Sequence, residues 1–380
     1  MLFRRLSVFA SGWILEAAEA VCGGEGVEVN DVLDILSRLI DKSLVIVEEQ
    51  ESGVRYRFLE TIRQYAREKL VEASETEQWQ TRHLEFYLRL AEQAEPRLRS
   101  GEQLEWFNRL EAEHDNLRAA FGFALERNHV ADALGFAAAL WRFWNVRGYW
   151  AEGRQWLTRA LAKSTARDAM RAKALYALSM LCWFNEDHLA MLAPIQESLP
   201  ISKELGEKRG IAEAINALGM FYGRSGNTIL FDREMYAKAL ALNGESLALW
   251  RELGDPWGIA ESLMYVGFGK RDLGDPVTSR VLLEESLALW RELGDRWGIA
   301  WTLNGLGFTV KVQGDYQRAI SYFTESYNTA EQLGERRIMF QSLGSLAQMA
   351  EYQGDYALAR SWAAKELKWA QSTSAPHSII

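Results

Sequence analysis

Apolar residues recur at every third or fourth position along most of the chain, which is the spacing of one buried face on an α-helix. The helical stretches end at fixed marks. A Gly-Asp pair closes one predicted helix and caps the next, because glycine adopts the left-handed closing conformation and aspartate accepts hydrogen bonds from free amides. The Gly-Asp pairs are Gly274-Asp275, Gly314-Asp315 and Gly354-Asp355, and the Leu-Gly pairs that close the following helices are Leu253-Gly254, Leu293-Gly294 and Leu333-Gly334. The pattern predicts consecutive helical hairpins.

These hairpins repeat at a period of about 40 residues. The segments ESLALWRELGDPWGIA, from Glu245, and ESLALWRELGDRWGIA, from Glu285, differ at one position, and related copies begin at Glu197 and Glu325. The interval between Glu197 and Glu245 is 48 residues, so that hairpin has either a lengthened second helix or a bulged loop between Gly226 and Glu245. A fixed period of this length indicates a repeat architecture.

A small residue follows Leu or Val at the same place in each first helix, where it lets the partner helix approach closely. These residues are Ser179, Gly219, Gly267, Gly307 and Ala347. The arrangement resembles the tetratricopeptide repeat over residues 131–371, and it implies a mainly α fold, an α-solenoid in which hairpins form a right-handed superhelix. The recurring Trp250, Trp257, Trp290 and Trp297 are predicted to pack at the junctions between repeats.

Residues 1–73 follow another pattern. Helical segments are predicted at 2–9, 14–21 and 30–40, then two strands, LVIVEE from Leu44 and RYRFLE from Arg55, with Ser52 and Gly53 as their turn. A last helix runs from Thr61 to about Ala73, which completes a winged helix with a small β-hairpin. Residues 74–130 are predicted to be a helical linker or bundle that leads into the repeats, and residues 372–380 a disordered tail.

The amino-acid sequence of this region also resembles a known family. LFRRLSVFASGWILEAAEAVC, LDILSRLIDKSLVIVEE and RYRFLETIRQYAREKL resemble bacterial signal-transducing NTPase regulators of the NB-ARC or LuxR type. The resemblance implies an ATPase, then a winged helix, then tetratricopeptide repeats. The phosphate-binding pattern GxxxxGK[ST] is absent, so we expect the C-terminal part of a longer ancestor that lacks the ATPase domain.

The charge balance bears on nucleic-acid binding. The formal net charge is -9, and residues 1–75 hold 9 Lys or Arg against 14 Asp or Glu. Phosphate contacts need clustered basic residues, so this charge balance argues against a nucleic-acid partner. One basic cluster on the wing offers a possible contact for nucleic acid or another partner: Arg55, Arg57 and Arg63.

The first helices of a tetratricopeptide array face its groove, and here they mix Met and aromatic side chains with Arg, Lys and Asn. This mixture suits a protein or peptide with apolar anchors and a carboxylate or a carbonyl-rich backbone. The predicted groove residues are Tyr176, Met180, Trp183, Asn216, Met220, Arg224, Met264, Phe268, Arg271, Trp301, Asn304, Phe308 and Lys311. The alternative is that some of them pack inside a tightly wound superhelix.

No other chemistry is indicated. The five histidines and two cysteines have no metal-ligand spacing, no nucleophile motif occurs, and no run of 18 apolar residues is present. We therefore expect a cytoplasmic, non-enzymatic regulatory scaffold without cofactor, metal or membrane span, which acts in signalling or transcriptional regulation. Two alternatives remain: a transcription regulator that binds DNA through the winged helix, and an orphaned sensor fragment of an ATPase regulator. The sequence leaves the partner and the oligomeric state open.

Overall fold

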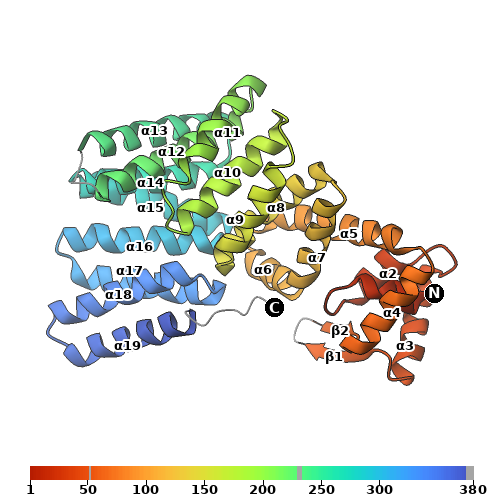
Figure 1. Cartoon of the computed structure of the whole chain (residues 1–380). Helices are drawn as coiled ribbons and strands as arrows, with labels where there is room; N and C mark the ends of the chain where they lie inside the picture. The colour runs from red at the N-terminus through yellow and green to blue at the C-terminus, as the bar shows by residue number, and fades with distance from the viewer. Residues whose placement is uncertain (51–52, 229–232, 374–380) are drawn as a thin grey trace. The chain divides into compact units, whose positions relative to one another are not determined.

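The computed structural model describes residues 1–50, 53–228 and 233–373, without the side chains of residues 50, 224–228 and 368–373 (Figure 1). The chain divides into two compact units. The first comprises residues 1–95, 108–140 and 162–164, and the second comprises residues 96–107, 141–161 and the remainder from 165. The chain therefore leaves the first unit at residue 96, re-enters it at residue 108, and leaves again within a helix.

The first unit begins with the predicted winged helix. Its elements are α1 (Leu2–Arg5), the 3-10 turn η1 (Leu6–Val8), α2 (Leu15–Cys22), η2 (Val29–Asp31), α3 (Val32–Asp41), β1 (Ile46–Gln50), β2 (Gly53–Arg57) and α4 (Glu60–Glu72). The strands pair antiparallel, with Val47 opposite Tyr56, and Tyr56 also exchanges two 2.8 Å backbone hydrogen bonds with Trp13. The sequence predicted Gly53 in the turn, but the structure places it as the first residue of β2. Ser52 lies outside the described residues.

Longer helices connect the winged helix to the repeats. They are α5 (Thr76–Arg97), α6 (Gln103–Ala112), α7 (His114–Glu126), α8 (Val130–Arg147) and α9 (Trp150–Leu161). Three of these helices, α5, α6 and α8, each begin in one unit and end in the other.

The repeats form stacked antiparallel pairs of helices, coloured green to blue in Figure 1. The pairs are α10 (Ala169–Phe184) with α11 (Leu192–Leu205), α12 (Lys208–Thr228) with α13 (Arg233–Leu253), α14 (Pro256–Asp272) with α15 (Pro276–Leu293), α16 (Arg296–Val312) with α17 (Tyr316–Leu333), and α18 (Arg336–Tyr352) with α19 (Tyr356–Thr373). Both α12 and α13 have 21 residues, whereas α14 has 17 and α15 has 18, so the extra residues lengthen both helices of that hairpin. The tail beyond Thr373 lies outside the described residues.

The predicted helix ends are confirmed. Gly294 and Gly334 close α15 and α17 with positive φ angles of 71° and 69°, a conformation that favours glycine. The carboxylates of Asp275 and Asp315 accept hydrogen bonds from backbone amides at the starts of α15 and α17.

The serine of the Glu-Ser pair that opens each copy of the repeat has a structural role. The serine hydroxyl in the second helix of four hairpins donates to a carbonyl of the first helix, at distances of 2.7–2.9 Å. The pairs are Ser198 with Ala172, Ser246 with Ala212, Ser286 with Ala260, and Ser326 with Ala300. This bond joins the two helices of a hairpin at the same place each time, which explains why the serine recurs with the repeat.

The predicted close approach at the small positions is confirmed. A Cβ atom added to Gly307 would lie 2.5 Å from the Phe323 ring, and one added to Gly267 would lie 2.8 Å from Leu283. Glycine at these places lets a large side chain of the second helix reach the first helix's backbone.

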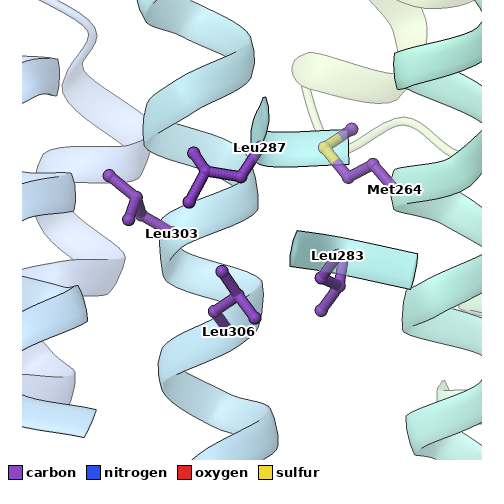
Figure 2. Close-up of a cluster of buried hydrophobic side chains, with 5 residues drawn as sticks. All are labelled: Met264, Leu283, Leu287, Leu303 and Leu306. Carbon is purple, nitrogen blue, oxygen red and sulfur yellow. The ribbon is translucent and has the colours of Figure 1, made fainter. Parts of the chain in front are cut away.

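Apolar side chains join successive hairpins. Figure 2 shows Met264 of α14, Leu283 and Leu287 of α15, and Leu303 and Leu306 of α16 turned toward one another in one buried cluster. The four recurring tryptophans predicted to pack at the junctions are also buried, between 0% and 4% exposed. Each hairpin thus covers the apolar face of the next, as expected for a solenoid. Among the described residues, no helix combines the length and apolar character that crossing a membrane requires.

Candidate ligand-binding pocket in the repeats

A pocket of about 190 Å³ opens on the face formed by the first helices of the repeats. Its lining comes from the first helices of five consecutive hairpins, α10, α12, α14, α16 and α18, and from the lengthened second helix α13. A site built from so many repeats is held in shape by the packing between hairpins. Ligand pockets are commonly concave sites of this kind, with apolar walls and a few polar groups.

Six aromatic rings line the pocket. They belong to Trp183, Phe184, Tyr236, Tyr265, Phe268 and Trp301. The rings of Tyr265 and Phe268 meet edge to face, with centroids 6.0 Å apart. Burial raises the pKa of Tyr265 well above its usual value of 10, so this phenol stays neutral. The walls can therefore accept a flat or branched apolar group.

Two guanidinium groups and one carboxylate add charge to the pocket. Arg271 pairs with the neighbouring Asp272 at 2.8 Å and lies 5.4 Å from the centroid of the Phe268 ring. Arg337 lies 5.6 Å from the Trp301 ring and 5.5 Å from the Phe184 ring. With both arginines and Asp272 ionised, the lining carries one net positive charge, whereas the whole chain is acidic.

A buried amide also faces this region. Asn243 of α13 lines the pocket and is 3% exposed, and its Oδ1 has no hydrogen-bond partner among the described residues. It packs against Gly219 of α12, where an added Cβ would lie 1.9 Å from Oδ1. An amide can exchange its oxygen and nitrogen positions by a flip, so Asn243 can offer either an acceptor or a donor.

The structure separates the predicted groove residues into two main groups. Five of them line the pocket: Trp183, Met220, Phe268, Arg271 and Trp301. Five others are 0–4% exposed and do not line the pocket: Tyr176, Met180, Asn216, Met264 and Asn304. For these five, the alternative of packing inside the array applies, because each first helix contacts its own partner helix and the neighbouring hairpins.

Three predicted groove residues remain. Phe308 and Lys311 are partly buried beside the pocket, where Arg271 lies 5.8 Å from the centroid of the Phe308 ring. The side chain of Arg224 lies outside the described residues. Sequence reasoning missed Tyr236 and Asn243, because it considered only first helices. The available signal for Asn243 was an amide at the place that Leu283 and Phe323 occupy in the next two repeats.

The wing arginines are not free basic groups. Arg55 is 8% exposed and forms an ion pair with Glu113, and it donates a 3.0 Å hydrogen bond to the Gly12 carbonyl. Arg57 pairs with Glu48 on the opposite strand, and Arg63 pairs with Glu60 at 2.8 Å. Arg55 is therefore a buried structural residue, contrary to its predicted contact role, because Glu113 and the Gly12 carbonyl hold its guanidinium inside the unit.

Comparison with known families agrees with both parts of the fold. The winged helix-turn-helix domain family matches residues 1–71, and the tetratricopeptide repeat family matches residues 258–332. Among the described residues, no group of three or more His, Cys, Asp or Glu is placed to hold a metal ion.

Two solved structures are similar over long stretches. One is a Rap protein complexed with Competence and Sporulation Factor, with a TM-score of 0.56, 14% identity, and coverage of 76% of this chain and 77% of that chain. The other is a STAND-class signal transduction ATPase with a tetratricopeptide repeat sensor from Pyrococcus horikoshii, with a TM-score of 0.52, 16% identity, and coverage of 99% and 57%. At these identities the similarity concerns the fold alone.

Curated relatives extend the comparison at the level of sequence. A candidate HTH-type transcriptional regulator of Mycobacterium tuberculosis is 35% identical over 232 residues, which is 59% of this chain and 26% of that protein. An uncharacterised protein of the same species is 42% identical over 77 residues, 20% of each chain. The chain thus spans about a quarter or less of the curated relatives it matches. This chain itself has a winged helix followed by tetratricopeptide-like repeats.

Proposed function

We propose that this chain is a non-catalytic regulatory scaffold whose repeats bind a protein or peptide segment, in transcriptional regulation or signalling. The observation that carries the proposal is the pocket itself. It combines aromatic walls with Arg271, Arg337 and the buried amide of Asn243, on a face that five hairpins build together. An extended segment fits this chemistry better than a small polar metabolite does, because the apolar walls dominate.

Each part of the lining matches a part of such a ligand. The rings of Phe268 and Trp301 suit an aromatic or large aliphatic side chain, since aromatic side chains dominate the energy of protein interfaces. The guanidinium groups suit a carboxylate, with which arginine forms charge-assisted hydrogen bonds. The amide of Asn243 suits a peptide group, which presents both a donor and an acceptor. The bound segment is therefore an extended peptide with an apolar anchor next to a free carboxylate.

The comparisons support the setting in two ways. The similar Rap protein was crystallised with Competence and Sporulation Factor. The sequence relative is named as an HTH-type transcriptional regulator. We extend both features, binding of such a factor and transcriptional regulation, to this chain as part of the proposal.

The test is a selection of hexapeptides with free carboxyl termini from a random library, on the intact chain. The selected peptides should bind the wild type in calorimetry, and Arg271→Gln should weaken binding by about tenfold through loss of a charge-assisted bond. Arg280→Gln is the matched control, because Arg280 pairs with Glu284 on α15 and does not line the pocket. Equal peptide recovery by wild type and the double variant Phe268→Ala, Trp301→Ala would refute the pocket assignment.

DNA binding through the winged helix is a second candidate, favoured by the match of residues 1–71 to the winged helix-turn-helix family. The charges favour it less. Exposed Asp31, Asp34 and Asp41 lie on or beside α3, and the wing arginines are all ion-paired. A gel shift at low salt with fragments of the host genome tests this candidate, and the absence of any retarded band would dispose of it.

A further inference from the structure

One carboxylate in the repeats is surrounded by groups from distant parts of the chain. Asp295, the capping residue of α16, is 0% exposed and accepts four hydrogen bonds. Its Oδ2 accepts from Arg142 Nη2 at 2.7 Å and Trp257 Nε1 at 2.8 Å, while Oδ1 accepts from Gln103 Nε2 at 3.1 Å and the Gly298 amide at 3.0 Å. We call Gln103, Arg142, Trp257, Asp295 and Trp297 the Asp295 cluster.

The cluster fixes the segment 96–107 on the repeats. Gln103 is also 0% exposed, donates to the Leu98 carbonyl at 2.7 Å, and accepts from the Trp297 amide at 3.3 Å. Arg142 donates to the same Leu98 carbonyl at 2.9 Å. The backbones also meet, since a Cβ added to Gly294 would lie 2.7 Å from the Gly101 Cα. Side chains and backbone of the segment are thus both held by residues of the repeat unit.

The neighbouring copy of the same sequence shows that this arrangement is specific. Asp255 occupies the equivalent place in ESLALWRELGDPWGIA and caps α14. Its carboxylate pairs with Arg209, whose side chain is 53% exposed, and accepts hydrogen bonds from the amides of Trp257 and Gly258. The repeat sequence therefore explains why Asp295 caps a helix, but it does not explain the Asp295 cluster.

Aromatic contacts link the cluster to the pocket. The Trp297 ring lies 6.0 Å from that of Trp301 and 6.2 Å from that of Phe184, and both of those residues line the pocket. The guanidinium carbon of Arg142 lies 4.9 Å from the Trp297 ring. A ligand group that contacts Trp301 or Phe184 therefore touches residues whose rings contact Trp297. The backbone amide of Trp297 in turn donates a hydrogen bond to Gln103.

The segment is also joined covalently to the first unit at both ends, through α5 and α6. Within that unit, Glu113 at the start of α7 accepts a 2.7 Å hydrogen bond from Tyr87 of α5 and forms an ion pair with Arg55 of β2. Helix α5, which leads into the segment, is therefore linked to the winged-helix strand β2 through Glu113.

We propose that the segment 96–107 reports occupancy of the pocket: a ligand that packs on Trp301 and Phe184 tightens the Asp295 cluster, and the firmer segment passes this state to α5 and α6. This inference rests on the proposed function for the identity of the ligand, but the coupling is a property of the chain and can be measured without one. Coupling between two sites is reciprocal in free energy, so weakening the pocket must loosen the segment.

Hydrogen exchange on the intact chain, read in peptides that cover residues 96–107, tests the coupling. Asp295→Asn should accelerate exchange there by about tenfold, because it leaves Arg142 buried without its carboxylate. Asp255→Asn, the matched control at the equivalent place, should leave the segment unchanged. If Asp295→Asn does not fold, Gln103→Ala serves instead, since it removes the segment's hydrogen bonds to Asp295 and the Trp297 amide, with the one to Leu98, and keeps the Arg142–Asp295 pair; the same acceleration is expected.

The decisive variant is Trp301→Ala, with Trp183→Ala as its control. Both residues line the pocket, but the Trp183 ring contacts His188, with centroids 4.7 Å apart, whereas the Trp301 ring contacts Trp297. Trp301→Ala should accelerate exchange in the segment by at least about threefold, and Trp183→Ala should not. Exchange in the segment that is unchanged in Trp301→Ala, or equally changed in both variants, would overturn the coupling. Failure to find a binding peptide would bear on the proposed function only, because these variants are measured without ligand.

Discussion

The substitution Glu335→Gln should stabilise the repeats, and the gain should appear as the pH rises above 4.5. Glu335 caps α18 and accepts a 2.6 Å hydrogen bond from the Ile338 amide, yet its side chain lies in a fully buried place at 1% exposure. Burial disfavours the ionised form and raises the pKa of this carboxyl from 4.5 to about 7, against the smaller opposing effects of the Ile338 amide and Arg337. Glutamine has the same shape and keeps an oxygen for the amide, but it carries no charge.

The pKa difference gives the size of the effect. A carboxyl whose pKa is higher in the folded state binds more protons there, so its stabilising contribution is complete below pH 4.5 and is lost as the pH rises to about 7. At about 1.4 kcal/mol for each pH unit between those values, the wild type loses about 3 kcal/mol relative to the glutamine variant. The gain from Glu335→Gln should therefore be small near pH 4.5 and about 3 kcal/mol at pH 8.

Urea unfolding followed by circular dichroism at several pH values between 4.5 and 8 measures this difference. Asp275→Asn is the comparison, because the hydrogen bonds from Thr278 lower the pKa of Asp275, which caps the exposed start of α15. That variant should gain nothing at pH 8 and should lose stability there. A Glu335→Gln variant that is less stable than wild type at pH 8, or whose advantage does not grow with pH, would refute the reasoning.

Three further predictions concern packing and buried bonds. Gly307→Ala should cost about 1–3 kcal/mol in urea unfolding, because its Cβ meets the Phe323 ring, whereas Gly344→Ala, with 3.6 Å to its nearest neighbour, should be neutral or stabilising; equal effects would contradict the close-approach argument. Ser286→Ala should cost about 1 kcal/mol through loss of its bond to α14, and no change would show that the serine is dispensable. Glu113→Ala should cost about 3–5 kcal/mol in thermal unfolding of the first unit, since it strands a buried guanidinium, and an unchanged melting temperature would rule this out.

The parts of the fold that the sequence predicted depend on short-range geometry. Helix ends at Gly294 and caps at Asp275 follow from the backbone angles and amide bonds of a few neighbouring residues. The small positions, such as Gly267 and Gly307, follow from helices that pack in the same register in each repeat. These features recur every 40 residues, so the pattern itself reveals them.

The candidate site was harder to predict, because it depends on which surfaces the fold leaves uncovered. The helical spacing placed Phe268 and Met264 on comparable faces of one helix, yet the structure leaves Phe268 lining the pocket and buries Met264 completely among leucines of the neighbouring helices. Asn243 comes from a second helix, and Arg337 from α18, a first helix that the predicted groove did not include. Arg55 reads as a free basic residue until Glu113, 58 positions away, is found beside it.

Two nearly identical copies of the repeat show most clearly which features the sequence determines and which depend on the tertiary structure. By itself the sequence determined that both Asp255 and Asp295 follow a closing glycine and cap a helix, since capping involves only the next few amides. Only the tertiary structure decided that Asp255 pairs with a largely exposed arginine while Asp295 is buried against Gln103 and Arg142, which lie 192 and 153 positions away. A carboxylate's environment is set by whatever the fold brings next to it, and identical neighbours in sequence carry no record of that.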